Sequence, residues 1–362
     1  MAKSLYVHIP FCHRICAYCD FAKVLYEERW AFSYVKEIER EIASIGIKEP
    51  LETIYLGGGT PSILPNGALE ELLGFLKPFL DERYEFTIET NPEDIDEEKL
   101  RILERCGVNR ISLGVESSSP RLLALMGRNH TFEKAKKAIS LIKNAGFARV
   151  SVDMIYGLPN ETKEEVEKDL SAFIGLGVNH ISTYCLSVNP GTAFHNAGYS
   201  EMDEESAGEQ YETILKALRD AGYRRYEVSN FAKNGEYSEH NLVYWRDEEY
   251  YAAGLGASGY VDGIRFDNTR NLTKYLSGKH REKEDKLSSE SELEDYFLTN
   301  LRLDDGFSED VFEKRFGFAF LSKYKEEFEE LERNRLMKHE RGRFFCTDKG
   351  IEILDSVLLK LF

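Results

Sequence analysis

The chain has 362 residues, of which 42% are hydrophobic and 31% are charged, a composition typical of globular proteins rather than of disordered chains or membrane proteins. No run approaches the roughly 20 consecutive apolar residues that a membrane-spanning helix needs, and no signal-peptide pattern is visible, so we expect a cytoplasmic protein without an integral membrane segment. The formal net charge of −17 argues against nucleic acid as a partner, because nucleic-acid binders offset phosphate charge with basic patches.

Up to about residue 190, short β-rich runs alternate with amphipathic helical patterns. The expected strands are 5–9, 53–56, 84–90, 110–115, 150–156 and 180–186, and the expected helices are 29–45, 67–80, 96–106, 131–145 and 161–176. A glycine stands between helix and strand at Gly107, Gly146, Gly177 and Gly222, where a left-handed residue suits the end of a helix. This repeat of βα units predicts a parallel α/β sheet, with a barrel or partial barrel favoured over a doubly wound sheet.

The rest of the chain predicts a connecting segment and a smaller domain. A further helix is expected at 203–221 and a strand at 225–228, while residues 278–294 are polar and rich in Ser and Glu, as at a domain boundary. Beyond the boundary we expect a small, mainly helical, winged-helix-like domain with a hairpin at 336–346 and a helix at 347–360. The predicted domains are a core barrel at 1–230, a connecting segment at 231–285 and a C-terminal domain at 286–362.

Three of the six cysteines lie close together, at Cys12, Cys16 and Cys19. Cytoplasmic thiols stay reduced, so such a group indicates metal binding or catalysis rather than disulfides. Thiolates are soft ligands for iron–sulfur clusters and for zinc. Three of them on one loop can hold three irons of a 4Fe–4S cluster and leave the fourth iron open. The alternative is a zinc site completed by His8 or His13, although structural zinc sites usually use paired CxxC units.

The other three cysteines stand alone in the sequence. Cys106 and Cys185 are flanked by apolar or helix–strand junction residues and are expected to be small buried residues. Cys346 lies on the expected C-terminal hairpin. If the loop of Cys12, Cys16 and Cys19 binds zinc instead of a cluster, the whole chain is a zinc-bound interaction module around an inert barrel, which is one alternative function.

The Cys-x3-Cys-x2-Cys loop after the first strand of a βα repeat resembles the radical S-adenosylmethionine (SAM) superfamily. The resemblance implies a partial (β/α)6 TIM-like barrel in which the open iron of a 4Fe–4S cluster binds SAM. It also implies that the reduced cluster cleaves SAM to a 5′-deoxyadenosyl radical. Active sites of such barrels lie at the carboxyl ends of the strands, which is where the cysteine loop is expected.

Further residues at these strand ends resemble the SAM-binding positions of one subgroup, the enzymes around oxygen-independent coproporphyrinogen III oxidase. The resemblance assigns SAM binding to Tyr6, Gly58, Gly59, Thr60, Glu89, Glu116, Arg128 and Asp153. A glycine run lets the backbone approach a ligand closely, and buried carboxylates cost desolvation free energy unless they meet a ligand or a cation. The subgroup usually carries Gln where Glu116 stands, and an ionised Glu accepts hydrogen bonds but cannot donate them.

Two features separate the chain from the oxidase itself. The oxidase has a further cysteine where Phe21 stands, and it has an N-terminal extension that this chain leaves no room for. Both features favour the related haem chaperones (the HemW family), whose HNxxYW motif is similar to residues 240–245. The oxidase reaction, radical decarboxylation of two propionates of coproporphyrinogen III to vinyl groups, is the alternative function.

The resemblance to haem chaperones implies haem as a ligand and haem-accepting apo-proteins, such as respiratory enzymes, as partners. Imidazole is a good axial ligand for haem iron, so His240 is the leading candidate for the haem site. Other histidines that stay open as ligands are His8, His13, His130 and His195. The expected cofactors are a 4Fe–4S cluster, SAM and haem, and a homodimer stays open.

Overall fold

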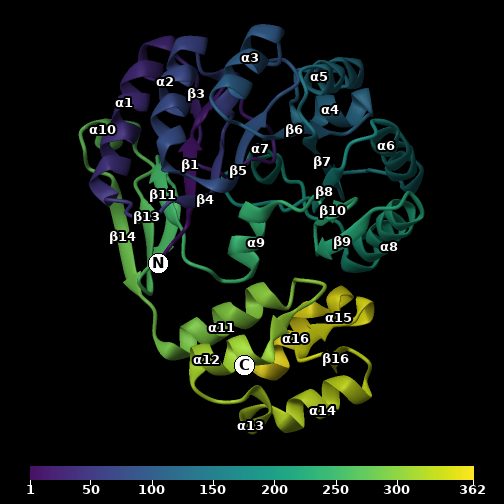
Figure 1. The fold of residues 1–362 in the computed structure, drawn as a ribbon. Coiled ribbons are helices and arrows are strands. Elements are labelled where there is room, and N and C mark those ends of the chain that lie inside the picture. The colour runs from purple at the N-terminus through teal and green to yellow at the C-terminus, as the bar shows by residue number, and fades with distance from the viewer.

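The computed structural model describes residues 1–362 and contains a nine-stranded sheet with helices along its outer side (Figure 1). Neighbouring strands follow the order β11-β1-β4-β5-β6-β7-β8-β10-β9. All pairs from β11 to β8 are parallel, and β10 and β9 add an antiparallel edge. Because the outermost strands β11 and β9 do not pair with each other, the sheet is an open, partial barrel.

All six strands that the βα repeat predicts are present in the sheet. They are β1 (Ser4–Ile9), β4 (Leu51–Gly58), β5 (Leu80–Thr90), β6 (Arg110–Glu116), β7 (Arg149–Tyr156) and β8 (His180–Cys185). The predicted helices are α1 (Glu28–Ile45), α2 (Asn66–Leu76), α3 (Glu97–Arg105), α5 (Phe132–Asn144), α6 (Lys163–Gly175) and α8 (Glu204–Asp220). The predicted partial barrel is confirmed. None of the helices combines the length and the apolar composition that crossing a membrane requires.

Several short elements escaped prediction, because they have too few residues to show a period. They are β2 (Phe11–Cys12), β3 (Val24–Leu25), η1 (Pro61–Ile63), α4 (Pro120–Met126), α7 (Ala193–Asn196) and β10 (Asn230–Ala232). The helix expected at 67–80 was predicted too long: α2 ends at Leu76 and a 3-10 turn, η2 (Lys77–Phe79), follows. Pro78 lies in this turn and lacks the N–H that a continuing α-helix would need.

The connecting segment contributes strands to two sheets. After β9 (Arg224–Glu227) and α9 (Glu239–Trp245), β11 (Tyr251–Gly254) pairs in parallel with β1. An antiparallel sheet follows, made of β12 (Ser258–Val261), β13 (Ile264–Asn268) and β14 (Arg281–Lys286), with α10 (Leu272–Leu276) before its last strand. β14 lies within the polar domain boundary expected at residues 278–294, where no strand was predicted. All of its residues are exposed, so it lacks the alternation that marks a half-buried strand.

The C-terminal residues form a separate helical domain beneath the barrel in Figure 1. Its elements are α11 (Ser289–Asn300), β15 (Phe307–Ser308), α12 (Glu309–Phe316), α13 (Phe320–Lys323), α14 (Lys325–Arg333), β16 (Met337–Glu340), β17 (Arg343–Cys346), α15 (Asp348–Glu352) and α16 (Leu354–Leu361). The predicted hairpin is confirmed as β16 and β17. The single helix expected at 347–360 is instead two helices, because Ile353 leaves the helical region at φ −123°.

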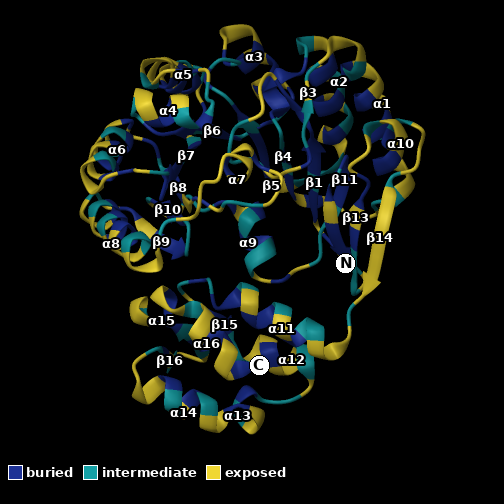
Figure 2. Ribbon diagram, turned by 180° about the vertical axis from the view of Figure 1, so that it is seen from behind, coloured by how far each residue is buried: buried dark blue, intermediate teal, exposed yellow.

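The two faces of the barrel sheet differ in chemistry. Outward side chains such as Leu56, Ile88 and Val152 belong to a core of 54 buried residues that packs against the surrounding helices. Figure 2 shows these helices buried toward the strands and exposed on their outer side. Inward positions carry polar side chains, among them Thr87 and Ser112. Because filled barrels pack branched apolar side chains inside, a polar inner face leaves room for a ligand.

Candidate functional site

The inside of the partial barrel encloses a cavity of about 390 Å³ that reaches the carboxyl ends of the strands. Its lining contains most of the predicted site residues: Cys12, Cys16, Cys19, Gly58, Gly59, Thr60, Glu89, Glu116, Arg128 and Asp153. The structure therefore brings together residues that lie up to 141 positions apart in the chain (Cys12 to Asp153). Tyr6 and His240 are not part of this lining.

The cysteine loop is held at both of its ends. The short strands β2 and β3 pair in parallel and place Cys12 opposite Leu25. Within the loop, the Cys19 amide donates to the Cys16 carbonyl at 3.2 Å, and the Ala17 amide donates to the Met126 carbonyl of α4 at 2.9 Å. These backbone bonds fix the loop, so the three thiols face the cavity without depending on a ligand.

The donor set fits a cluster of several irons better than a single zinc ion. No group of three or more His, Cys, Asp or Glu side chains is arranged to hold one metal ion, whereas in a 4Fe–4S cluster each thiolate binds a different iron. Both nitrogens of His8 are engaged, with the Tyr6 hydroxyl at 2.9 Å and the Ala22 carbonyl at 2.7 Å. His13 instead faces Asp94, with Nε2 3.4 Å from Oδ1. Neither histidine completes a zinc site with the cysteines.

Burial makes the thiolates costly unless a cation accompanies them. Burial and, to a smaller extent, the nearby Cys19 raise the pKa of Cys12 to about 12. Burial also raises the pKa of Cys19. Metal ligands must be deprotonated, so these thiols would release protons when iron binds. Two cations lie near the loop: the Arg128 guanidinium, with Nη1 3.6 Å from the Cys16 sulfur, and the Lys23 ammonium, which donates to the Cys19 carbonyl.

The glycine run at the end of β4 packs so closely against neighbouring segments of the chain that a side chain would not fit there. A Cβ on Gly58 would lie 2.5 Å from the His8 ring, and one on Gly59 would lie 2.7 Å from the Pro10 carbonyl. Gly58 also has φ +117°, which residues other than glycine rarely adopt. Its amide donates to Glu89 at 3.0 Å. The close backbone and the Glu89 carboxylate fit a ligand's amino group, as SAM binding requires.

Three carboxyl groups lie on the barrel strands: the buried Glu116 at the end of β6, and the half-buried Glu89 near the end of β5 and Asp153 within β7. Burial raises the pKa of Glu89, that of Glu116 to about 7 and that of Asp153 to about 6. Near neutral pH the Glu116 carboxyl is therefore partly protonated and can donate a hydrogen bond as a Gln would. Glu116 also has φ +65°, a strained backbone of the kind that gathers at ligand sites.

Arg128 links the cysteine loop to the strand ends. Its Nη2 donates to Asn91 at 2.7 Å and to the Gly114 carbonyl at 2.6 Å. The same nitrogen lies 3.6 Å from the Glu116 carboxylate. The Tyr18 hydroxyl donates to this carboxylate at 3.1 Å. The guanidinium thus offsets the charge of Glu116 and orients it toward the cavity.

Tyr6 and His240 lie behind the cavity wall rather than in it. The Tyr6 ring stacks on Tyr55 at a centroid distance of 6.2 Å. His240 is fully buried and also stacks on Tyr55, at 5.2 Å. Its Nδ1 bonds the Thr53 hydroxyl at 2.7 Å and its Nε2 bonds the Tyr244 hydroxyl at 2.8 Å. In this conformation neither His240 nitrogen is free to bind haem iron.

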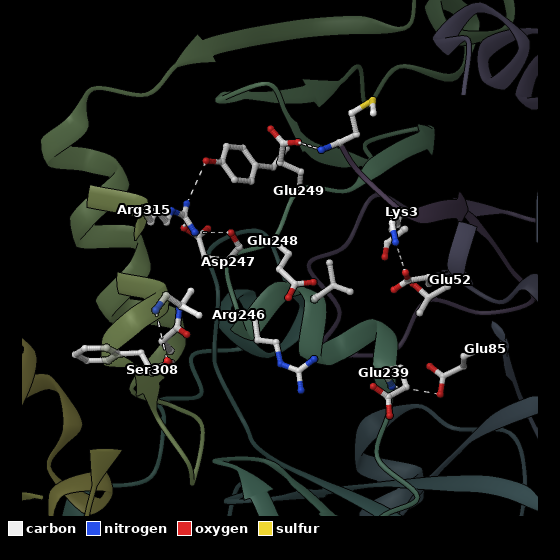
Figure 3. A pocket seen from close by; sticks show the side chains of 18 of the residues that line it. Lys3, Glu52, Glu85, Glu239, Arg246, Asp247, Glu248, Glu249, Ser308 and Arg315 are labelled. Carbon is white, nitrogen blue, oxygen red and sulfur yellow. Dashed lines mark hydrogen bonds and ion pairs between the residues drawn. The ribbon is translucent and has the colours of Figure 1, made fainter. Parts of the chain in front are cut away.

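The helix that carries the HNxxYW sequence, α9, separates this cavity from a second one. Ser238 and Asn241 line the barrel cavity, whereas Glu239, Val243 and Arg246 line a space of about 1510 Å³ between the barrel and the C-terminal domain (Figure 3). Within the motif, the asparagine and not the histidine therefore reaches the predicted cofactor cavity.

The second cavity is strongly charged, and much of that charge is already paired. Lys3 bonds Glu52 at 2.5 Å, and Arg315 bonds Asp247 at 2.7 Å (Figure 3). None of the predicted site residues lines this space. It marks the junction between the barrel and the C-terminal domain.

The structure adds residues to the cavity that the sequence did not assign to the site. They include Tyr18, Tyr55, Asn91, Arg110, His180, Cys185, Ser238 and Asn241. Side chains along a strand point alternately into and out of the barrel, and this pattern could have identified the added residues on β4, β6 and β8. The expectation that Cys185 is buried was wrong: it is exposed, because β8 ends there at the cavity mouth. Cys106 is buried, as expected.

Comparisons with known proteins identify relatives of the chain. Residues 6–173 match the radical SAM superfamily and residues 287–353 match the HemN C-terminal domain. The chain is 40% identical to the haem chaperone HemW of Lactococcus lactis, over 99% of this chain and 97% of that protein. It is 33% identical to the haem chaperone HemW of Bacillus subtilis, over 96% of each chain. The structure of coproporphyrinogen III oxidase (HemN) from Escherichia coli superposes with a TM-score of 0.85 at 21% identity, covering 99% of this chain and 89% of that one. This last likeness shows a shared fold.

Proposed function

Because the chain belongs to the radical SAM superfamily and, within it, to the HemW family of haem chaperones, we propose that it binds haem and transfers it to apo-acceptor proteins. The observation that carries the proposal is the 40% identity to a haem chaperone over 99% of the chain. The proposed acceptors are haem-dependent enzymes such as those of respiration. The proposed compartment is the cytoplasm, where free thiols stay reduced.

The proposal includes a 4Fe–4S cluster on Cys12, Cys16 and Cys19 and SAM in the barrel cavity. When bound, such a cluster supplies an electron to SAM and a coordination site for it. This chain's own residues would position the cofactor: the Gly58 backbone and Glu89 at an amino group, and Glu116 at hydroxyl groups. The close backbone at Gly58 and these carboxyl groups support this assignment.

His240 is the proposed haem ligand only in a state in which α9 has moved. Ligation would require breaking the bonds from His240 to Thr53 and Tyr244 and uncovering a side chain that is now fully buried. His13 is the alternative ligand, because it is exposed and lines the cavity mouth. Haem titrations of His240→Ala and His13→Ala, followed by absorbance, separate the two.

The test of haem transfer uses the protein reconstituted anaerobically with iron, sulfide and SAM and then loaded with haem. It is mixed with the apo-form of a respiratory b-type cytochrome, and haem arrival is followed by absorbance. We expect a transfer rate that increases with acceptor concentration, because the two proteins must meet. A rate that is independent of acceptor concentration and equals haem loss to apomyoglobin would refute direct transfer.

A parallel incubation with coproporphyrinogen III, SAM and a reductant tests the oxidase. Protoporphyrinogen formed in catalytic excess over the protein would replace the chaperone proposal with the enzyme. If no product forms, the result excludes the oxidase reaction only when the protein is shown to hold its cluster and to bind SAM.

A further inference from the structure

The barrel cavity continues below the predicted SAM residues to a polar floor. Arg110 and His180 are the first residues of β6 and β8, so they lie at the opposite strand ends from the cysteine loop. Thr87 stands two residues before Glu89 on β5, and Ser238 and Asn241 come from the start of α9. All five residues line the cavity. We call them the cavity floor.

Three polar atoms of the cavity floor are buried without a hydrogen-bond partner. They are Thr87 Oγ1, His180 Nδ1 and Ser238 Oγ, on residues that are exposed by 0%, 2% and 3% respectively. Leaving a buried polar group without a partner typically costs about 1–3 kcal/mol. All three atoms belong to residues that line one cavity, and we infer that a group bound there completes their hydrogen bonds.

The tautomer of His180 identifies one of these atoms as a donor. His180 Nε2 lies 2.8 Å from the Tyr226 hydroxyl, which already accepts the Ser238 amide at 3.2 Å. The hydroxyl's own proton then goes to Nε2, which leaves the ring proton on Nδ1. Burial keeps this imidazole neutral by lowering its pKa. His180 therefore presents an N–H to the cavity.

The cation at the floor is Arg110, whose side chain is 1% exposed. Its Nη2 donates to Ser151 at 2.8 Å, so the Ser151 hydroxyl has its own proton left to donate. Glu85 lies 3.8 Å from Arg110 and is shared with Arg149 at 3.5 Å. Glu89 and Asp153 face the same cavity from nearer its mouth. Arg110 Nη1 also donates to the Glu236 and Tyr237 carbonyls at 3.3 and 3.1 Å, whereas Thr87, His180 and Ser238 each keep a polar atom without a partner.

We propose that the cavity floor binds the carboxylate of a small monocarboxylic acid, with Thr87, His180 and Ser238 as donors and Arg110 as the cation. A carboxylate brings several acceptor sites and no donor, which matches a floor that offers protons. The acid's carbon chain points toward the predicted SAM position. This proposal does not depend on haem transfer.

The test follows ¹³C-labelled butyrate by NMR line broadening on reconstituted protein that is saturated with SAM. We expect saturable binding that is at least tenfold weaker in Thr87→Val/Ser238→Ala and unchanged in Thr213→Val, which removes a hydroxyl on α8 outside the cavity. SAM binding and the thermal midpoint of each variant serve as folding controls. Unlabelled butyramide should displace butyrate at least tenfold less well than butyrate itself does.

Three results would overturn the proposal. The absence of saturable binding means that the floor holds only water. Unchanged binding in the double variant places butyrate elsewhere. Equal competition by butyramide removes the role of the carboxylate charge, and this comparison on the unmodified protein holds even where the double variant fails to fold.

Discussion

The Arg128 guanidinium lies 3.6 Å from the Cys16 sulfur, although the two residues are 112 positions apart in the chain. Arg128 also donates to Asn91 and to the Gly114 carbonyl, so one side chain connects the cysteine loop with the ends of β5 and β6. A lysine has no fork of donors and cannot make these contacts together.

Replacing Arg128 with Lys is therefore expected to loosen the cluster while leaving the three thiols in place. Groups that orient metal ligands typically change metal affinity by about 10–100-fold when mutated. We expect iron loss to a chelator to be about tenfold faster in Arg128→Lys. The control is Arg121→Lys, which alters an exposed ion pair with Glu165. Equal rates in the two variants would contradict a role of Arg128 at the cluster.

The three cysteines of the loop are expected to be required together. Reconstituted wild-type protein should hold about four irons per chain, and alanine at Cys12, Cys16 or Cys19 should remove most of the iron and the brown colour. Cys185→Ser is the matched control, because Cys185 lines the same cavity but lies outside the loop. Full iron content in any of the three loop variants, or stoichiometric zinc in the wild type, would disprove the cluster.

A methyl group at Gly58 is expected to block SAM binding without unfolding the chain. The added Cβ would lie 2.5 Å from the His8 ring at a φ of +117°, and overpacking of this kind typically costs about 1–3 kcal/mol. We expect SAM affinity to fall at least about tenfold in Gly58→Ala, as measured by calorimetry on the reconstituted protein.

The comparison for Gly58 is Gly74, which lies on α2 with no atom within 4 Å of its added Cβ. Alanine there should raise the free energy of unfolding by about 0.5–1 kcal/mol, because glycine is a poor helix former. SAM affinity should not change. Equal SAM affinities in both glycine variants would mean that the glycine run is only a turn.

His240 is expected to make the chain less stable in acid. Burial lowers its pKa to about 3, against about 6.5 in an unfolded chain. Between these values the unfolded chain binds a proton that the folded chain does not, so the free energy of unfolding falls as the pH falls below 6.5.

The contribution of His240 is measured by urea unfolding of wild type and His240→Gln between pH 8 and pH 5. The wild type should be more stable at pH 8, where His240 keeps its bonds to Thr53 and Tyr244. This advantage should shrink by about 1.4 kcal/mol per pH unit below about pH 6. His195→Gln, at an exposed position, is the control. A constant difference across this pH range would show that His240 is accessible to solvent.

The sequence by itself determined the parallel βα repeat and ten of the residues that line the cavity. The period of the strands, the glycines that end the helices and the spacing of Cys12, Cys16 and Cys19 are local patterns. Parallel strands bring their carboxyl ends to one edge, so residues that follow different strands meet there. Gly58, Glu89, Glu116 and Arg128 lie in one cavity for this reason.

Only the tertiary structure decided which way the residues around α9 face. His240 and Asn241 are neighbours in the chain, yet Asn241 lines the cavity and His240 is buried against Tyr55. The Glu85 carboxylate of β5 accepts the His240 amide at 3.1 Å and so fixes the start of the helix. The position of a seven-residue helix depends on such long-range contacts, because its own sequence is too short to define a face. The same contacts bring Ser238 to the cavity floor beside His180, a proximity that no local pattern encodes.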